Sequence, residues 1–155
     1  MQRPTLVAIV SGALGGAVAI ALMELIASNA AFPLMTVPFA TSTVLVMGSP
    51  NAEPAQPRAL IGGHVIATLV GLVVVKAIGP GPWIAALAVG LAIAAMHLTR
   101  TFHPPAGIDP LIVVTNNLSW TFLAAPVAIG ACLLAAFAFT WHKVVQHDAW
   151  PTRWR

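Results

Sequence analysis

Apolar stretches alternate with short polar connectors along the whole chain. Long, almost uncharged stretches cover residues 5–27, 59–78, 83–100 and 120–143. Each is close to the ~20 residues that an α-helix needs to cross the hydrocarbon core of a bilayer. The pattern therefore predicts an all-α, polytopic membrane protein with four long spans.

Two shorter apolar segments, residues 32–48 and 103–115, lie between the long stretches and contain prolines. Pro38 stands inside the first, and Pro104 and Pro105 begin the second. Proline has no amide donor and is best tolerated in the first turn of a helix. We expect two short, proline-started helices, either broken or re-entrant. Irregular backbone survives at membrane depth only when it is buried in protein or lines a cavity, so these segments indicate a functional site.

The order of a long apolar stretch, a short apolar segment and a second long stretch occurs twice, in halves of about residues 5–78 and 83–143. If the short segments cross the membrane, there are six crossings and the halves form inverted repeats. If they re-enter and return, there are four crossings and the halves are parallel. Six crossings place every basic residue except Lys76 on one side, whereas four split the seven five to two. Because basic residues mark the cytoplasmic face, we favour six crossings, an inverted repeat and cytoplasmic termini.

Composition supports a single transmembrane domain over residues 1–155. Hydrophobic residues make up 59% of the chain and charged residues only 7%, whereas a soluble globule has roughly a quarter charged residues. We expect a bacterial inner membrane protein whose partner is the lipid bilayer, with residues 144–155 as an interfacial tail. The first apolar stretch is too long for a secretory signal, so we expect it to be retained. No basic stripe indicates nucleic acid.

The sequence contains no recognisable metal-binding or catalytic motif. Cys132 is the single cysteine, which excludes an internal disulfide and the usual multi-cysteine zinc patterns. His64, His97, His103 and Asp109 are suitable zinc ligands by type, but their spacing matches no metal motif. We expect no metal, no cofactor and no catalytic activity. A histidine-based metal-dependent membrane enzyme remains the least favoured alternative.

Ionisable residues within apolar segments are costly in lipid and by default mark a site in the bundle interior. His64 follows Gly63, which permits close helix approach, and Gly107 is expected to do the same beside the second short segment. Asp109 is expected to pair with an imidazole or with Arg58, or to be protonated, because an isolated buried carboxylate costs several kcal/mol.

Two motifs resemble those of a known family. His103-Pro104-Pro105-Ala106-Gly107 resembles the signature of the HPP family of integral membrane proteins, and residues 56–64, QPRALIGGH, resemble its QPR…IGGH element. The resemblance covers about residues 5–143. It implies a compact membrane protein, with family members in bacteria and plastids, some of them associated with nitrite transport. The sequence departs from the family pattern at Ala59, Leu60 and Asp109.

These observations predict a transporter or channel for a small inorganic anion, with nitrite the leading candidate through the resemblance and proton linkage left open. Helix N-termini inside the membrane favour anions. A non-transporting scaffold or assembly subunit is the main alternative. Glycines throughout the spans allow tight helix contacts and predict a homo-oligomer. The candidate pathway residues are Thr41, Ser42, Thr43, Arg58, Gly63, His64, His103, Pro104, Pro105, Ala106, Gly107 and Asp109.

Overall fold

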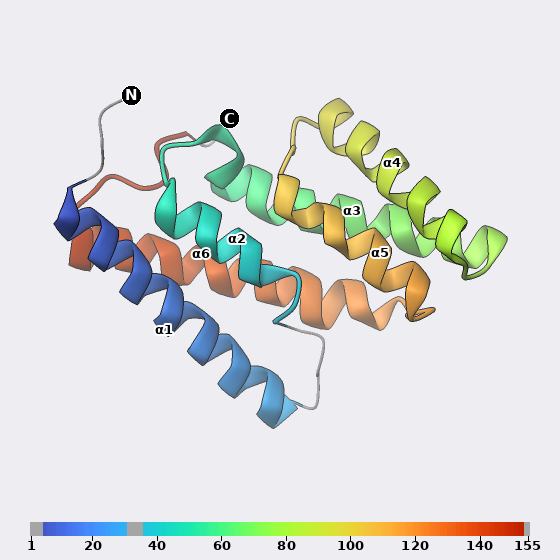
Figure 1. Ribbon diagram of the computed structural model, residues 1–155, viewed down its shortest axis with the longest axis horizontal. Coiled ribbons are helices and arrows are strands. Elements are labelled where there is room, and N and C mark those ends of the chain that lie inside the picture. Colours follow the sequence, from blue (N-terminus) through green and yellow to red (C-terminus); the bar gives the residue numbers. More distant parts are fainter. Residues whose placement is uncertain (1–4, 31–35, 154–155) are drawn as a thin grey trace.

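The computed structural model describes residues 5–30 and 36–153, and every regular element in these ranges is helical (Figure 1). The main helices are α1 (Leu6–Ala30), α2 (Phe39–Gly48), α3 (Pro57–Ile78), α4 (Pro82–Leu98), α5 (Ile108–Thr115) and α6 (Gly130–Trp141). Short 3-10 turns, η1 (Glu53–Ala55) and η2 (Pro104–Gly107), precede α3 and α5. Two π-helical stretches, η3 (Leu123–Ile129) and η4 (His142–Gln146), flank α6.

Three helices of the described ranges are long and apolar enough to cross a membrane: Leu6–Asn29, Pro57–Ile78 and Leu123–Gln146. The fourth predicted span, α4, has 17 residues, or about 26 Å at 1.5 Å per residue, slightly less than a ~30 Å hydrocarbon core. The prediction of a polytopic helical membrane protein is confirmed, with α4 shorter than expected. The two predicted short helices are present as α2 and as η2 with α5.

Prolines and one glycine set several helix boundaries. Pro57, Pro82 and Pro104 each lie in the first turn of α3, α4 and η2, where a missing amide donor costs nothing. Gly79 ends α3 with φ of 106°, a conformation that glycine adopts without strain. Pro126 is inside the last long helix, where the backbone becomes π-helical because proline cannot donate to the preceding turn.

One end of the bundle collects the chain's basic residues. Arg58, at the start of α3, donates to the Thr99 carbonyl just after α4 at 3.2 Å. His142, near the end of the last helix, donates to the Val46 carbonyl near the end of α2 at 3.2 Å. This basic end carries Arg58, Arg100, Lys143 and Arg153.

At the opposite end, Lys76 donates to the Asn117 side chain, just after α5, at 3.3 Å. Gly63, early in α3, faces His103, and Gly71, two turns later, faces Pro110, so the segment from η2 through α5 runs parallel to α3. The described helices thus pass along the bundle in alternating directions, with α2 and α5 as the shortest passes. Their directions match those of the six-crossing arrangement, and the crossing of the bilayer by α2 and α5 stays a prediction.

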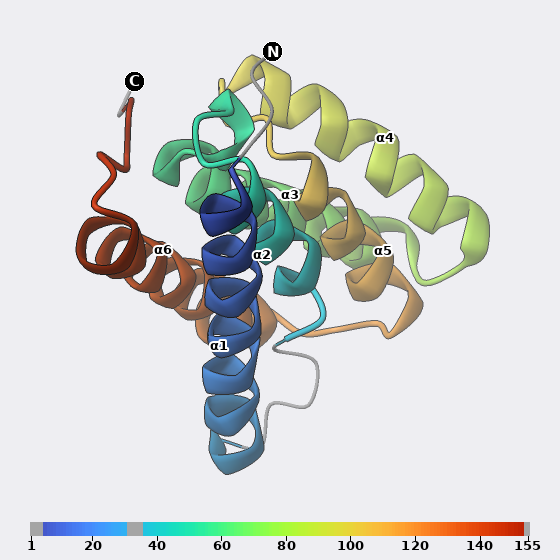
Figure 2. The ribbon, with the colours of Figure 1, turned by 60° about the vertical axis from the view of Figure 1, so that its left-hand side comes forward.

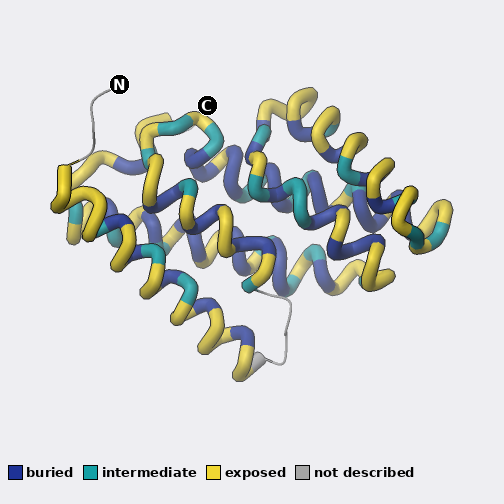
Figure 3. Tube along the Cα trace, viewed as in Figure 1, coloured by how far each residue is buried: buried dark blue, intermediate teal, exposed yellow. Residues whose placement is uncertain are grey.

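Helix α3 lies at the centre of the bundle, between α4 and α5 on one side and α2 and α6 on the other (Figures 1 and 2). The outer faces of α1 and α4 are largely exposed, whereas the inner faces, which α1 turns toward α2 and α6 and α4 turns toward α3, are more buried (Figure 3). Large apolar side chains such as Leu6, Leu25, Trp83 and Leu98 are exposed on these outer faces. A surface of this kind suits contact with lipid rather than with water.

Candidate functional site

A polar cluster lies in the interior of the apolar bundle, where the two short helices meet α3. We define the histidine cluster as Ser42 on α2, His64 and Thr68 on α3, His103 just before η2, and Asp109 on α5. All five residues are completely buried, with 0% exposure. The cluster therefore joins residues from both halves of the sequence at one buried point.

The cluster forms one continuous chain of hydrogen bonds. Asp109 Oδ2 lies 2.8 Å from His64 Nδ1, and His64 Nε2 lies 2.7 Å from Ser42 Oγ. The same Ser42 oxygen lies 2.9 Å from His103 Nε2. His103 Nδ1 in turn donates to the Pro54 carbonyl at 2.6 Å. Every ring nitrogen of the two imidazoles therefore has a hydrogen-bond partner.

Local sequence explains how His64 and His103 approach each other. A Cβ atom at Gly63 would lie 2.5 Å from His103 Cβ and 2.9 Å from the Thr101 carbonyl oxygen, so only glycine permits this packing. His64 and Thr68 are four residues apart and project from the same face of α3. Both contact the same oxygen of Asp109, Thr68 by donating from Oγ1 at 3.2 Å.

Aromatic and small residues close the cluster on the side of α2. The Phe39 ring packs against the His64 ring with centroids 4.6 Å apart, and the two imidazole rings are 5.1 Å apart. Phe39 fits against Gly130, where a Cβ atom would lie 2.5 Å from the ring. Packing of this kind excludes water from the hydrogen-bond chain.

Two buried oxygens have no hydrogen-bond partner within residues 5–30 and 36–153. These are Asp109 Oδ1 and Thr43 Oγ1. Buried polar atoms are normally paired, because an unmade hydrogen bond costs about 1–3 kcal/mol. Since Oδ2 makes both contacts with α3, Oδ1 is left free to carry or accept a proton.

The structure brings together four of the predicted pathway side chains, Ser42, His64, His103 and Asp109, and places Gly63 beside them. The predicted partner for Asp109 is confirmed as an imidazole, that of His64. The HPPAG segment and the segment from Pro38 meet through the bond between Ser42 and His103. The inverted-repeat relation between the two halves stays a prediction.

Other predicted residues lie apart from the cluster. Thr41 is exposed, and Arg58 is exposed at the basic end, where its guanidinium binds the Thr99 carbonyl rather than the carboxylate. The expected close approach at Gly107 is wrong, because no described atom lies within 4 Å of a Cβ built there. In the HPPAG segment, Pro104, Pro105 and Ala106 form η2, with Ala106 buried and Pro104 exposed.

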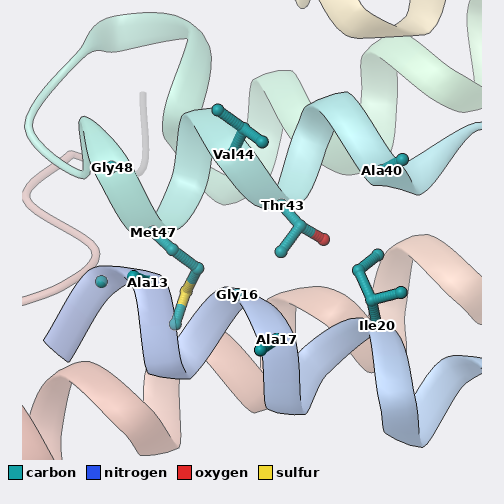
Figure 4. Close-up of a pocket in the computed structure, with 10 residues that line it drawn as sticks. Ala13, Gly16, Ala17, Ile20, Ala40, Thr43, Val44, Met47 and Gly48 are labelled. Carbon is teal, nitrogen blue, oxygen red and sulfur yellow. The ribbon is translucent and has the colours of Figure 1, made fainter. Parts of the chain in front are cut away.

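Thr43 faces a groove between α1 and α2 rather than the cluster. The groove has a volume of about 450 Å³, and small residues such as Gly16 and Ala40 lie along it (Figure 4). Its wall is almost entirely apolar, with Met47 and Ile20 reaching across it (Figure 4). The Thr43 methyl group faces Gly16 across the groove, and its hydroxyl takes no part in the hydrogen-bond chain.

Sequence reasoning missed three participants: Pro54, Thr68 and Phe39. A backbone carbonyl such as that of Pro54 leaves no sequence signal. Thr68 is four residues after His64, and the buried residues of α2, Phe39, Ser42, Thr43, Val46 and Met47, follow an i, i+3, i+4, i+7, i+8 pattern. Helical spacing could therefore have identified Thr68 and selected Ser42 over Thr41.

No group of three or more metal-ligating side chains comes together within the described residues. His97, one of the four candidate ligands, is exposed and stacks on Phe102 with ring centroids 4.1 Å apart. The chemistry available to the cluster is therefore hydrogen bonding and proton transfer. Its order of hydroxyl, imidazole and carboxylate is that of a Ser-His-Asp triad, but Ser42 is completely buried and binds a second imidazole.

Comparisons with known proteins agree with this picture. Residues 1–151 match the family described as HPP, transmembrane region. Two Dictyostelium discoideum proteins, each named only as a transmembrane protein, are 34% and 33% identical to the chain over 124 residues, or 75% of it. The chain spans about two fifths of their length, 40% and 44% respectively. No solved structure matches. The chain belongs to the HPP family of transmembrane proteins.

Proposed function

We propose that this protein transports a small inorganic anion through the membrane, with nitrite as the leading candidate. The observation that supports the proposal is the histidine cluster, a chain of completely buried polar groups that joins both short helices inside an apolar bundle. The nitrite assignment rests on the resemblance of the HPPAG and QPR…IGGH motifs to the family.

The cost of burying the cluster argues for a functional role. Replacing a buried ion pair by packed hydrophobic residues is often neutral or stabilising, so His64 and Asp109 are not needed for stability alone. Ionisable groups inside membrane segments generally mark substrate or proton pathways. Short helices that begin within a bundle also direct unpaired amides and a positive dipole end toward such a site.

The charge distribution suits an anion and supports the proposed orientation. Four basic residues gather at one end of the bundle, whereas Lys76 lies at the other. By the positive-inside rule, we propose that the basic end and both termini face the cytoplasm of a bacterial cell. A concentration of positive charge also raises the local concentration of anions at that mouth.

Transport requires the two short helices to separate. Ser42 is the only bridge between the imidazoles in the described hydrogen-bond chain, so an opening of α2 away from both α3 and η2 breaks the bonds at 2.7 and 2.9 Å together. We also propose a homo-oligomer, because Gly90 and large apolar residues leave the outer faces of α4 and α1 without partners within the described chain. Light scattering of the purified protein measures the oligomer.

The test is anion flux into liposomes that contain the purified protein, comparing nitrite, nitrate, formate and chloride. Ser42→Ala removes the hydroxyl that links the imidazoles, and Thr41→Ala, its exposed neighbour, is the matched control. We expect nitrite flux above that of empty liposomes in the wild type and in Thr41→Ala, and a strong reduction in Ser42→Ala. Wild-type flux equal to that of empty liposomes for all four anions would disprove the proposal.

A scaffold or assembly subunit is the second candidate, and the complete burial of the cluster favours it. In that case the hydrogen bonds of Ser42 serve only to hold the short helices together. Ser42→Ala would then lower the unfolding midpoint of the protein, while no anion would move in any variant. The proposal assigns no catalytic reaction and no cofactor to the cluster.

A further inference from the structure

The hydrogen bonds of the histidine cluster limit where its hydrogens can lie. A carbonyl oxygen only accepts, so His103 Nδ1 carries a hydrogen and donates it to Pro54. Ser42 has one hydroxyl hydrogen, and its oxygen lies within hydrogen-bond distance of Nε2 of both imidazoles and, at 3.4 Å, of the Pro38 carbonyl. Ser42 donates to only one of these three acceptors, so Nε2 of at least one imidazole must carry its own hydrogen and donate to Ser42.

Two arrangements keep the Ser42 hydroxyl on one of its two short contacts, at 2.7 and 2.9 Å, rather than on the Pro38 carbonyl at 3.4 Å. In the first, Ser42 donates to a neutral His103, and His64 donates to Ser42 from Nε2. The contact between His64 Nδ1 and Asp109 Oδ2 then holds one further proton, on either atom. In the second, Ser42 donates to His64 Nε2, His64 donates from Nδ1 to an ionised Asp109, and His103 carries a hydrogen on each ring nitrogen.

Both arrangements contain one proton more than two neutral imidazoles and a carboxylate, and both have zero net charge. They interconvert by three transfers in sequence: Asp109 Oδ2 to His64 Nδ1, His64 Nε2 to Ser42 Oγ, and Ser42 Oγ to His103 Nε2. Each transfer breaks one O–H or N–H bond and forms another. The result is a carboxylate at one end and an imidazolium at the other, with no other co-reactant.

We propose that the histidine cluster carries one mobile proton, which passes between Asp109 and His103 through His64 and Ser42. Continuity of the four contacts, from 2.6 to 2.9 Å, and the exclusion of water around them support the proposal. Between the two arrangements, the hydrogen bonds on both sides of Ser42 reverse their direction of donation. The proposal deepens the transport function and rests on it for its physiological purpose.

The two ends of the proton chain have different surroundings. At the Asp109 end, Thr68 fixes Oδ2, while Oδ1 stays without a partner in the described structure. The His103 end adjoins a cavity of about 280 Å³ at the basic end, whose wall includes Pro54 and Phe102. The ionisable groups facing that cavity are Glu53, His97 and Arg100.

The difference between the two ends indicates where a proton can leave the chain. An anion that enters from the basic end meets the chain first at its His103 end. If the anion displaces the Pro54 carbonyl from His103 Nδ1, the N–H bond at Nδ1 breaks and an O–H bond forms on nitrite. The neutral conjugate acid crosses an apolar interior at much lower cost than the anion. The carboxylate left at Asp109 then has to regain a proton through Oδ1 before the next cycle.

Asp109→Asn is the sharpest test, because it preserves the first arrangement while removing the mobile proton. The new amide donates to His64 Nδ1, His64 donates to Ser42, and Ser42 donates to His103, so the chain of bonds persists in one fixed direction. The Thr68 hydroxyl can turn to a backbone carbonyl one helical turn earlier. We therefore expect a folded protein that elutes in size-exclusion chromatography like the wild type.

Nitrogen NMR of isotope-labelled histidine shows which ring nitrogens carry a hydrogen, and it needs no transport assay. We expect His103 Nδ1 to be protonated in both proteins, and in the wild type we expect either a hydrogen on His64 Nε2 or a doubly protonated His103. In Asp109→Asn, His64 should stay neutral with its hydrogen on Nε2. Wild-type spectra in which both imidazoles are neutral and carry hydrogen only on Nδ1 would overturn the proposal.

Flux measurements separate the proton chain from the transport function. In liposomes with an internal pH dye, nitrite uptake by the wild type should acidify the interior beyond the background of empty liposomes, and Asp109→Asn should reduce this acidification to background. Acidification at the wild-type rate in Asp109→Asn overturns the mobile proton. Absence of nitrite uptake in the wild type overturns the transport function instead, and the NMR result still decides the proton.

Discussion

Replacing Gly63 by alanine tests whether the close approach of α3 to His103 holds the cluster together. A Cβ atom at this position would lie 2.5 Å from His103 Cβ and 2.9 Å from the Thr101 carbonyl oxygen. Carbon atoms pack at about 3.5–4.0 Å, so the segment before η2 must move away from α3 by about 1 Å. Neither atom is the flexible end of a side chain, so a rotamer change cannot relieve the clash.

Two opposing contributions set the size of the effect. Overpacking a core typically costs about 1–3 kcal/mol, whereas alanine gains about 1 kcal/mol over glycine in a helix interior. Gly90→Ala in α4 is the matched control, since no described atom lies within 4 Å of a Cβ there and only the helix gain applies. The difference between the two variants isolates the packing cost, which corresponds to roughly 2–12 °C in the unfolding midpoint.

The same displacement would also break one hydrogen bond of the histidine cluster. His103 carries the Nε2 atom that lies 2.9 Å from Ser42, and a shift of about 1 Å takes this contact beyond hydrogen-bond distance. We expect Gly63→Ala to have a lower unfolding midpoint than Gly90→Ala in detergent and to lose nitrite flux in liposomes. Equal midpoints for the two variants would refute the close packing of His103 on α3.

Two further predictions concern the buried carboxylate and the orientation of the bundle. Asp109→Leu leaves His64 Nδ1 buried without its partner, so we expect a loss of about 3 kcal/mol in equilibrium unfolding, in contrast to a small change for Asp109→Asn. In a background without the native cysteine, Lys76→Cys should react with an impermeant thiol reagent from the periplasm, whereas Arg153→Cys should react only after permeabilisation. Labelling of both from the same side would contradict the six-pass path.

The sequence predicts the course of the chain well because membrane helices carry strong local signals. Long apolar stretches located α1, α3, α4 and the last helix, and the prolines at residues 57, 82 and 104 stand in first helical turns. These features depend on a helix's own residues and on the bilayer, and need no knowledge of neighbouring helices. The π-helical stretch at Pro126 was not predicted, because the proline is compatible with either a kink or a change of hydrogen-bond register.

The candidate site was predicted in its residue types but not in its connections. Thr41, Ser42 and Thr43 are consecutive hydroxyls on one helix, and only Ser42 faces both imidazoles. In a soluble helix the polar face separates such candidates, whereas α2 has apolar residues on every side and no clear boundary. Arg58 is a plausible partner for Asp109 by charge. The structure places Arg58 at the basic end and Asp109 deeper in the bundle, and this difference in depth depends on tertiary packing.

The fold and the candidate site of this protein depend on the same contacts. An experiment therefore has to distinguish an effect on stability from an effect on transport. Ser42 joins α2 to the segment before η2, and His64 joins α3 to α5, so truncating either residue removes a tertiary contact together with a step of the proton chain. A loss of flux in such a variant is therefore ambiguous unless stability is measured beside it. Asp109→Asn avoids the ambiguity, since the amide retains the contact with His64 but has no proton to release. A folded Asp109→Asn protein that still takes up nitrite without acidification would show that the cluster carries the proton and that a different part of the bundle admits the anion.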